Sequence, residues 1–97
     1  MNITKIQNEN EITLGIAGRL DTITAPDLEK EIAGVSSANS MVIDCSKLDY
    51  ISSAGLRVLL SAHKAFAKKG GMIVKNVNET VLDIFDVTGF KDILNIQ

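Results

Sequence analysis

The sequence has a single cysteine, a single histidine, a single proline and no tryptophan. One cysteine cannot form an intramolecular disulfide. Cys45 lies in the apolar run 41–45, so we expect a small buried core residue rather than a reactive thiol. His63 has no second histidine to join it, and a metal site needs several such ligands. The sequence therefore predicts no metal site, and His63 is expected to be a partly exposed structural residue.

Clusters of basic residues and long apolar runs are also missing. Lys68 and Lys69 are the only adjacent pair of basic residues, and the net charge is −2. Binding to nucleic acid or to an anionic membrane needs a basic surface, so we expect neither. No apolar run approaches the roughly 20 residues of a membrane span, and the N-terminus shows no signal-peptide pattern. We therefore expect a cytoplasmic protein that does not insert into a membrane.

What is present is typical of a soluble globular protein, with 45% hydrophobic and 23% charged residues. The length of 97 residues fits one domain, assigned to residues 1–97. Alternating apolar residues predict strands at 2–7 and 12–18. Thr24 before Ala25-Pro26-Asp27 predicts a helix start with a hydroxyl cap and an early proline. The apolar face of that helix comprises Ala25, Leu28, Ile32 and Val35.

The second half of the chain continues to alternate between strand and helix patterns. The predicted elements are a strand at 41–45, a helix from Ser53 to about Lys69 that Gly70-Gly71 ends, a strand at 72–77, a short helix capped by Asn78 and closed by Gly89, and a last short strand within 90–97. A strand, a helix and a strand of this size form a right-handed βαβ unit. We expect an α/β (mixed α+β) fold: a mixed β-sheet of about four to five strands with flanking α-helices in a single compact domain.

The turn Ser52-Ser53-Ala54-Gly55 opens the longer of these helices. At about 100° per residue, one face gathers a predicted core stripe, the opposite face is polar, and a few apolar residues lie on a flank. The core stripe comprises Gly55, Val58, Leu59, Ala62, Ala65 and Phe66; the polar face Ser53, Arg57, Ser61, Lys64 and Lys68; the flank Leu56, Leu60 and Ala67. Ser53 is therefore expected to point outward at the head of the helix.

Three interpretations of this turn remain open on the residues alone. Ser52 or Ser53 can cap the helix by accepting N–H groups of its first turn. A catalytic nucleophile is disfavoured, because His63 lies about 15 Å along the same helix and no other base accompanies the serines. A dedicated nucleotide pocket is disfavoured because no glycine-rich phosphate loop is present, although a helix N-terminus attracts anions. Asp44 and Asp49 alone do not make the carboxylate cluster of an aspartyl-phosphate receiver.

Three segments together carry a resemblance to a known family. "GRLDTITAPDLEKEI", "MVIDCSKLDYISSAGLRVLL" and "FDVTGF" resemble the STAS domain, in the branch of anti-sigma factor antagonists. The resemblance runs from about Ile3 to Ile96. It implies a binding protein without enzymatic activity or cofactor. Such a protein captures an anti-sigma factor, itself a serine kinase that uses ATP and Mg²⁺, and so releases a sigma factor. Phosphorylation of a serine ends the capture, and a PP2C-type phosphatase restores it.

By position, the resemblance implies Ser53 as the phosphorylated residue, with Ser52 as the neighbouring candidate. Family members often have an acid where Ser52 stands and a hydroxyl residue where Ala54 stands. Asp21 and Thr22 match the segment beside the phosphoserine. The remaining residues expected to contact the partner are Ser52, Ala54, Gly55, Leu56, Arg57 and Leu60, with the two leucines supplying apolar contact.

Two other functions remain as alternatives. The chain could be a STAS scaffold subunit that docks on a transporter or signalling complex, with the serine acting only as a helix cap. It could also bind a small nucleotide at the helix head. Phosphorylation separates the first alternative from partner switching, and titration with ATP or GTP separates the second.

Overall fold

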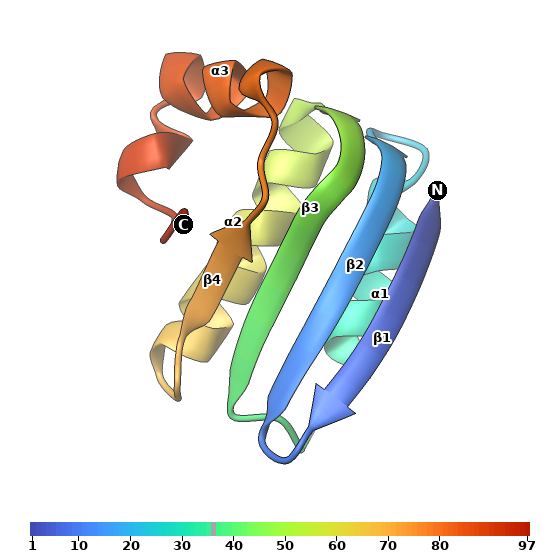
Figure 1. Cartoon of the computed structure of the whole chain (residues 1–97), viewed down its shortest axis with the longest axis vertical. Coiled ribbons are helices and arrows are strands. Elements are labelled where there is room, and N and C mark those ends of the chain that lie inside the picture. Colours follow the sequence, from blue (N-terminus) through green and yellow to red (C-terminus); the bar gives the residue numbers. More distant parts are fainter. Residues whose placement is uncertain (36) are drawn as a thin grey trace.

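The computed structural model describes residues 1–35 and 37–97, which alternate strands and helices in the predicted order (Figure 1). The elements are β1 (Asn2–Asn8), β2 (Glu11–Leu20), α1 (Ala25–Ala33), β3 (Ser40–Ile51), α2 (Ser53–Ala67), β4 (Met72–Lys75), α3 (Glu79–Thr88) and the 3₁₀ helix η1 (Phe90–Asp92). Within the described residues the strands form one four-stranded sheet in the order β1-β2-β3-β4. This confirms the predicted mixed sheet with flanking helices.

Strand directions follow from the connections. The tight turn at Glu9-Asn10 makes β1 and β2 an antiparallel hairpin, whereas β2–β3 and β3–β4 are parallel pairs joined through α1 and α2. Figure 1 shows both of these helices behind one face of the sheet, and α3 across the end where β3 stops and α2 starts. That end also carries the connection from β2 to α1. The predicted βαβ unit is confirmed for β3-α2-β4.

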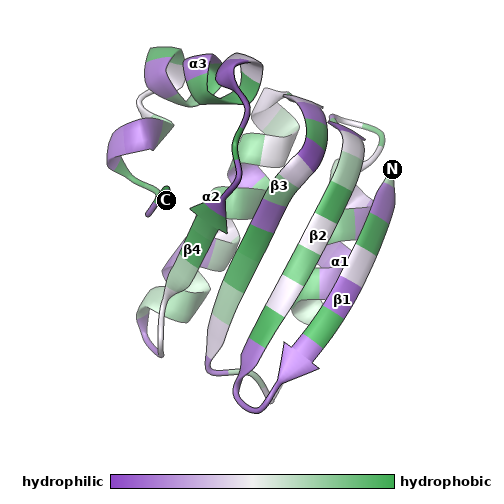
Figure 2. Cartoon of the chain, viewed as in Figure 1, coloured by the Kyte–Doolittle hydropathy of each residue, from purple (hydrophilic) through white to green (hydrophobic). Residues whose placement is uncertain are grey.

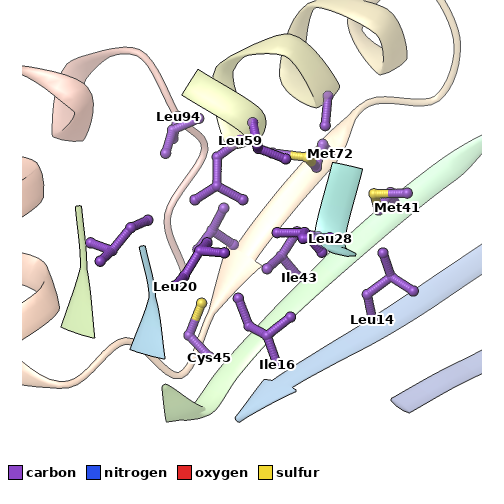
Figure 3. Close-up of a cluster of buried hydrophobic side chains, with 14 of the residues drawn as sticks. Leu14, Ile16, Leu20, Leu28, Met41, Ile43, Cys45, Leu59, Met72 and Leu94 are labelled. Atoms are coloured by element: carbon purple, nitrogen blue, oxygen red, sulfur yellow. The ribbon is translucent and has the colours of Figure 1, made fainter. Parts of the chain in front are cut away.

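The core lies between the sheet and the two helices behind it. Leu14 and Ile43 point from neighbouring strands towards Leu28 of α1 and Leu59 of α2, and each of the four is fully buried (Figure 3). Figure 2 shows hydrophobic residues alternating along β2 and running continuously through the first half of β3. Burial of such side chains removes apolar surface from water and is the main favourable term for a domain of this size.

The first residues of β3 are buried on both faces, as predicted. Met41 and Ile43 face the helices, whereas Val42 faces the other side of the sheet and is still only 6% exposed. Its cross-strand partners Thr13 and Ile73 flank it on either side.

Two predicted elements differ from the structure. β3 runs on to Ile51, because register shifts at Gly15/Ala17 and Gly18/Arg19 bend it without ending it. The expected last strand within 90–97 is wrong. Gly89, at φ 83°, turns the chain into η1, and beyond it Ile96 makes only an isolated bridge with Val74.

Candidate functional site

The chain passes from β3 into α2 with no intervening loop. Ser52 is extended (φ −103°, ψ 178°), and its N–H donates to the carbonyl of Leu20 at 2.9 Å. Its own carbonyl accepts from the N–H of Leu56 at 2.9 Å, which closes the first helical turn. Ser53 is therefore the first residue of α2, and its side chain is exposed as predicted.

Gly55 allows this helix head to lie against the end of the sheet. A Cβ atom at Gly55 would lie 2.6 Å from Cγ of Leu20 and 2.9 Å from Cγ1 of Ile51. Real Cβ contacts are longer, so a side chain here would push the helix away from the core. Gly55 is itself buried, and it packs the head of α2 against the end of the sheet.

Neither serine caps the helix through its side chain. Ser52 occupies the N-cap position, but it makes no side-chain capping hydrogen bond, and its Oγ is buried without a partner among the described residues. Ser53 lies inside the helix. The capping interpretation is therefore wrong for both serines. The predicted cap of α3 is confirmed, because Oδ1 of Asn78 accepts from the N–H of Val81 at 2.8 Å.

The loop between β2 and α1 is held by its own side chains. Oδ1 of Asp21 accepts from the N–H groups of Ile23 (3.0 Å) and Thr24 (3.2 Å). Oγ1 of Thr24 accepts from the N–H of Asp21 at 2.9 Å and donates to the carbonyl of Arg19 at 2.7 Å. These donors, foremost the N–H of Thr24, lower the pKa of the Asp21 carboxyl. Thr24 thus fixes the loop and makes no side-chain cap for α1, which corrects the predicted hydroxyl cap.

This loop lies beside the serine turn. Leu20, the last residue of β2, pairs with Ile51, the last residue of β3, and the Ser52 N–H bonds to the Leu20 carbonyl. One residue before, the guanidinium of Arg19 stacks over the ring of Tyr50 at 4.3 Å. The predicted rim residues follow directly: Asp21 is half-buried and Thr22 is exposed.

The exposed face of α2 agrees with prediction on its polar side. Ser53, Arg57, Ser61, Lys64 and Lys68 are all exposed. Leu60 is half-buried, but Leu56, expected on the open flank, is only 4% exposed. It belongs to the buried cluster that also holds Val81, Phe85 and Leu94. The core therefore includes this flank position, and the predicted place of Leu56 between the buried and the solvated face is wrong. Ala65, expected in the core, is exposed instead.

Sequence reasoning missed Ile23, whose side chain is 84% exposed in the same loop. The available signal was its position between Thr22 and Thr24 in a turn, where no strand or helix period assigns it to a core.

Three other side chains with potentially reactive groups are those of Cys45, Asp44 and His63. Cys45 is 1% exposed, and burial raises the pKa of its thiol to about 12, so little reactive thiolate forms near neutral pH. Asp44 accepts from Nδ2 of Asn76 and from the N–H of Ser46, both at 3.0 Å, and these bonds lower its carboxyl pKa. His63 is half-buried, and its Nδ1 has no hydrogen-bond partner in the described part of the chain.

Residues 1–35 and 37–97 contain no group of three or more His, Cys, Asp or Glu side chains placed to hold a metal ion. None of the helices in those residues is both long enough and apolar enough to cross a membrane.

Comparison with known proteins identifies the family of this chain. The model of the STAS domain family matches residues 2–97, so the chain belongs to the STAS domain family. The chain is also 35% identical over 99 residues to the anti-sigma-B factor antagonist of Bacillus subtilis, covering 100% of this chain and 91% of that protein.

Solved structures share the fold. An anti-sigma factor antagonist from Mycobacterium paratuberculosis superposes with a TM-score of 0.88 at 24% identity, covering 98% of this chain and 83% of that one. The anti-sigma factor antagonist SpoIIAA in its unphosphorylated form gives a TM-score of 0.83 at 15% identity, covering 99% of this chain and 88% of that one.

Proposed function

We propose that this chain is an anti-sigma factor antagonist whose binding is switched by phosphorylation of Ser53. In this function the unphosphorylated chain captures a serine-kinase anti-sigma factor and so releases a sigma factor. Similarity over the whole length to the Bacillus subtilis antagonist supports the class of function. The observation that carries the switch is the exposed Ser53, the first residue of a helix, beside a loop that its own hydrogen bonds hold.

Accessibility favours Ser53 over Ser52 as the phosphorylated residue. A kinase must bring the γ-phosphate of ATP in line with the attacking hydroxyl. Oγ of Ser52 is buried, and its backbone is bonded to both Leu20 and Leu56, so reaching it requires opening the turn. The Ser53 side chain is exposed and needs no such opening.

A phosphate at this position should leave the fold intact. It adds a charge of about −1.5 to −2 and three acceptor oxygens. The first turn of α2 contains no acidic residue to repel it and no side-chain cap to compete with it. The positive end of the helix dipole favours such a charge by roughly 0.3–1 kcal/mol. Phosphorylation should therefore act on binding.

Binding should fall because the partner must cover the modified residue. A charge that is stripped of water without gaining a partner costs several kcal/mol. The proposed contact surface comprises Thr22, Ala54, Arg57 and Leu60 together with Ser53, and a phosphate on this surface stays hydrated only if the partner leaves.

The remaining components lie outside this chain. The kinase supplies ATP and Mg²⁺, a PP2C-type phosphatase removes the phosphate, and the chain itself binds without catalysis or cofactor. The switch is placed in the cytoplasm, where its ATP-dependent kinase and the sigma factor act.

The test is phosphorylation by an anti-sigma factor serine kinase from the same organism, with the site mapped by mass spectrometry. Phosphate is expected on Ser53, with none incorporated into Ser53→Ala and normal incorporation into the matched control Ser52→Ala. A phosphopeptide mapped to Ser52, or incorporation that persists in Ser53→Ala, would show that the wrong serine was chosen. If no kinase of this type modifies the chain, permanent docking as a scaffold subunit becomes the better account.

A further inference from the structure

Large apolar side chains are exposed at a few positions in the described residues, and one of them lies next to the proposed switch. Ile6, Ile23, Val87 and Ile93 are 67%, 84%, 85% and 46% exposed. Exposed apolar side chains are common singly and need no explanation by themselves. Ile23 differs from the others in what lies beside it, because its loop directly follows Leu20, which pairs with Ile51 and accepts the Ser52 N–H.

The backbone around Ile23 is fixed by hydrogen bonds on both sides. Its own N–H donates to Oδ1 of Asp21 at 3.0 Å, and the next N–H, of Thr24, donates to the same oxygen at 3.2 Å. The N–H of Ala25 donates to the carbonyl of Asp21 at 2.8 Å, which joins the loop to α1. A side chain on such a loop loses little backbone freedom when it is buried against a partner.

The position of the loop connects Ile23 to Ser53. Leu20 immediately precedes the loop, and its carbonyl accepts the N–H of Ser52 at 2.9 Å. Because Gly55 has no side chain, the head of α2 lies close to the same leucine. A protein that covers Ser53 from the solvent side is therefore expected to contact the loop that follows β2 as well. Of the two leucines expected to supply apolar contact there, Leu56 is buried and only Leu60 is partly exposed.

We infer that Ile23 is the apolar anchor of the partner interface, inserted into a hydrophobic pocket of the anti-sigma factor kinase next to its phosphorylation site. This inference rests on the proposed function, since it assigns a contact within that complex. Interfaces concentrate their affinity in a few well-buried apolar anchors surrounded by near-neutral contacts. Asp21 and Thr24 act as positioning residues for the anchor.

The experiment is calorimetric titration of an anti-sigma factor serine kinase with the wild-type chain, Ile23→Ala and Ile6→Ala. The control removes the same group from an exposed isoleucine on β1. Losing three buried carbons should weaken binding of Ile23→Ala by about 10- to 50-fold, with little dependence on salt. Ile6→Ala should bind within about twofold of wild type. Both variants should keep the wild-type melting temperature, because both side chains are exposed.

Phosphorylation kinetics give a second readout. An anchor that contributes equally to the complex and to the transition state raises KM for the chain as a substrate and leaves kcat unchanged. Ile23→Ala is therefore expected to raise KM by about the same factor as its dissociation constant. If the wild-type chain binds and is phosphorylated while Ile23→Ala matches it in affinity and KM, the anchor is wrong and the proposed function stands. If the wild-type chain neither binds nor is phosphorylated, the proposed function itself fails.

Discussion

The heads of α2 and α3 have nearly the same backbone but different side chains. Ser52 (φ −103°, ψ 178°) and Asn78 (φ −76°, ψ 171°) are both extended residues that lead directly into a helix. Asn78 completes its helix: Oδ1 accepts from Val81, and Nδ2 donates to the carbonyl of Leu48 at 2.8 Å. Ser52 makes neither kind of bond. The α3 head is built for stability, whereas the α2 head leaves its first turn without a side-chain cap and exposes Ser53.

The largest expected effect follows from placing a charge on the α2 head. Ser53→Asp should weaken kinase binding by about 100-fold or more, because an unpaired carboxylate buried at an interface costs several kcal/mol and about 1.4 kcal/mol is tenfold. The fold should survive, because an acid at a helix N-terminus is favourable. Titration calorimetry and thermal unfolding measure the two effects separately. Weak binding accompanied by a melting temperature several degrees lower would place the effect in the fold rather than at the interface.

Gly55→Ala should be the most damaging small substitution at the α2 head. Its Cβ meets Leu20 and Ile51 at 2.6 and 2.9 Å, so unfolding free energy should fall by about 1–3 kcal/mol. Gly34→Ala is the matched control, because its Cβ meets only carbonyl oxygens at 3.6 Å, and it should be neutral or slightly stabilising. Urea unfolding measures both, and equal losses in the two variants would mean that close approach at Gly55 does not matter.

Truncation of the two N-cap residues tests their difference directly. Asn78→Ala should lower the free energy of unfolding by about 1–2 kcal/mol, because the helix loses its cap and the Leu48 carbonyl loses that donor. Ser52→Ala should change stability by less than about 0.5 kcal/mol, or raise it, because it removes a buried hydroxyl that has no partner. Chemical denaturation with unchanged m-values is the measurement. A cost at Ser52 as large as that at Asn78 would reveal a hydrogen bond that the structure does not contain.

The smallest expected effect is that of low pH on the loop between β2 and α1, through the Asp21 carboxyl. The carboxyl pKa of Asp21 is lowered from its ordinary value of 3.8, so the folded state binds fewer protons than the unfolded state in this range. Its stabilising contribution is present above pH 3.8 and is lost as the pH falls through the lower, folded pKa. NMR titration of the Ile23 and Thr24 amides should give a midpoint below 3.8. A midpoint at or above that value would mean that these N–H groups do not hold the carboxylate.

The α3 head was predictable because its determinants are local. Asn78 and Gly89 act through backbone groups within a few residues, so their roles as cap and terminator follow from the sequence. The polar face of α2 was predictable for the same reason. Leu56 and Ala65 were misplaced because the helical period alone does not fix where the buried face of a helix ends: Leu56 is buried and Ala65 is exposed.

The loop and the chain end were less predictable for a different reason. Ile23 is exposed because Asp21 and Thr24 form a compact turn, a feature of backbone geometry that no apolar period records. The segment after Gly89 alternates weakly like a strand, yet Leu94 enters the core through a turn in which its N–H bonds to the Phe90 carbonyl at 2.9 Å. Local turn geometry therefore decided the first segment, and tertiary packing decided the second.

The most direct test of the account uses the phosphorylated chain itself. The chain phosphorylated on Ser53 and the unmodified chain are each titrated into the kinase, and each is melted alone. Phosphorylation is expected to weaken binding by at least about 100-fold. The melting temperature is expected to be unchanged or a few degrees higher, because the phosphate sits at an uncapped helix N-terminus. Equal affinity of the two forms would contradict a switch at the α2 head, and a clearly lower melting temperature would show that the phosphate acts by unfolding it.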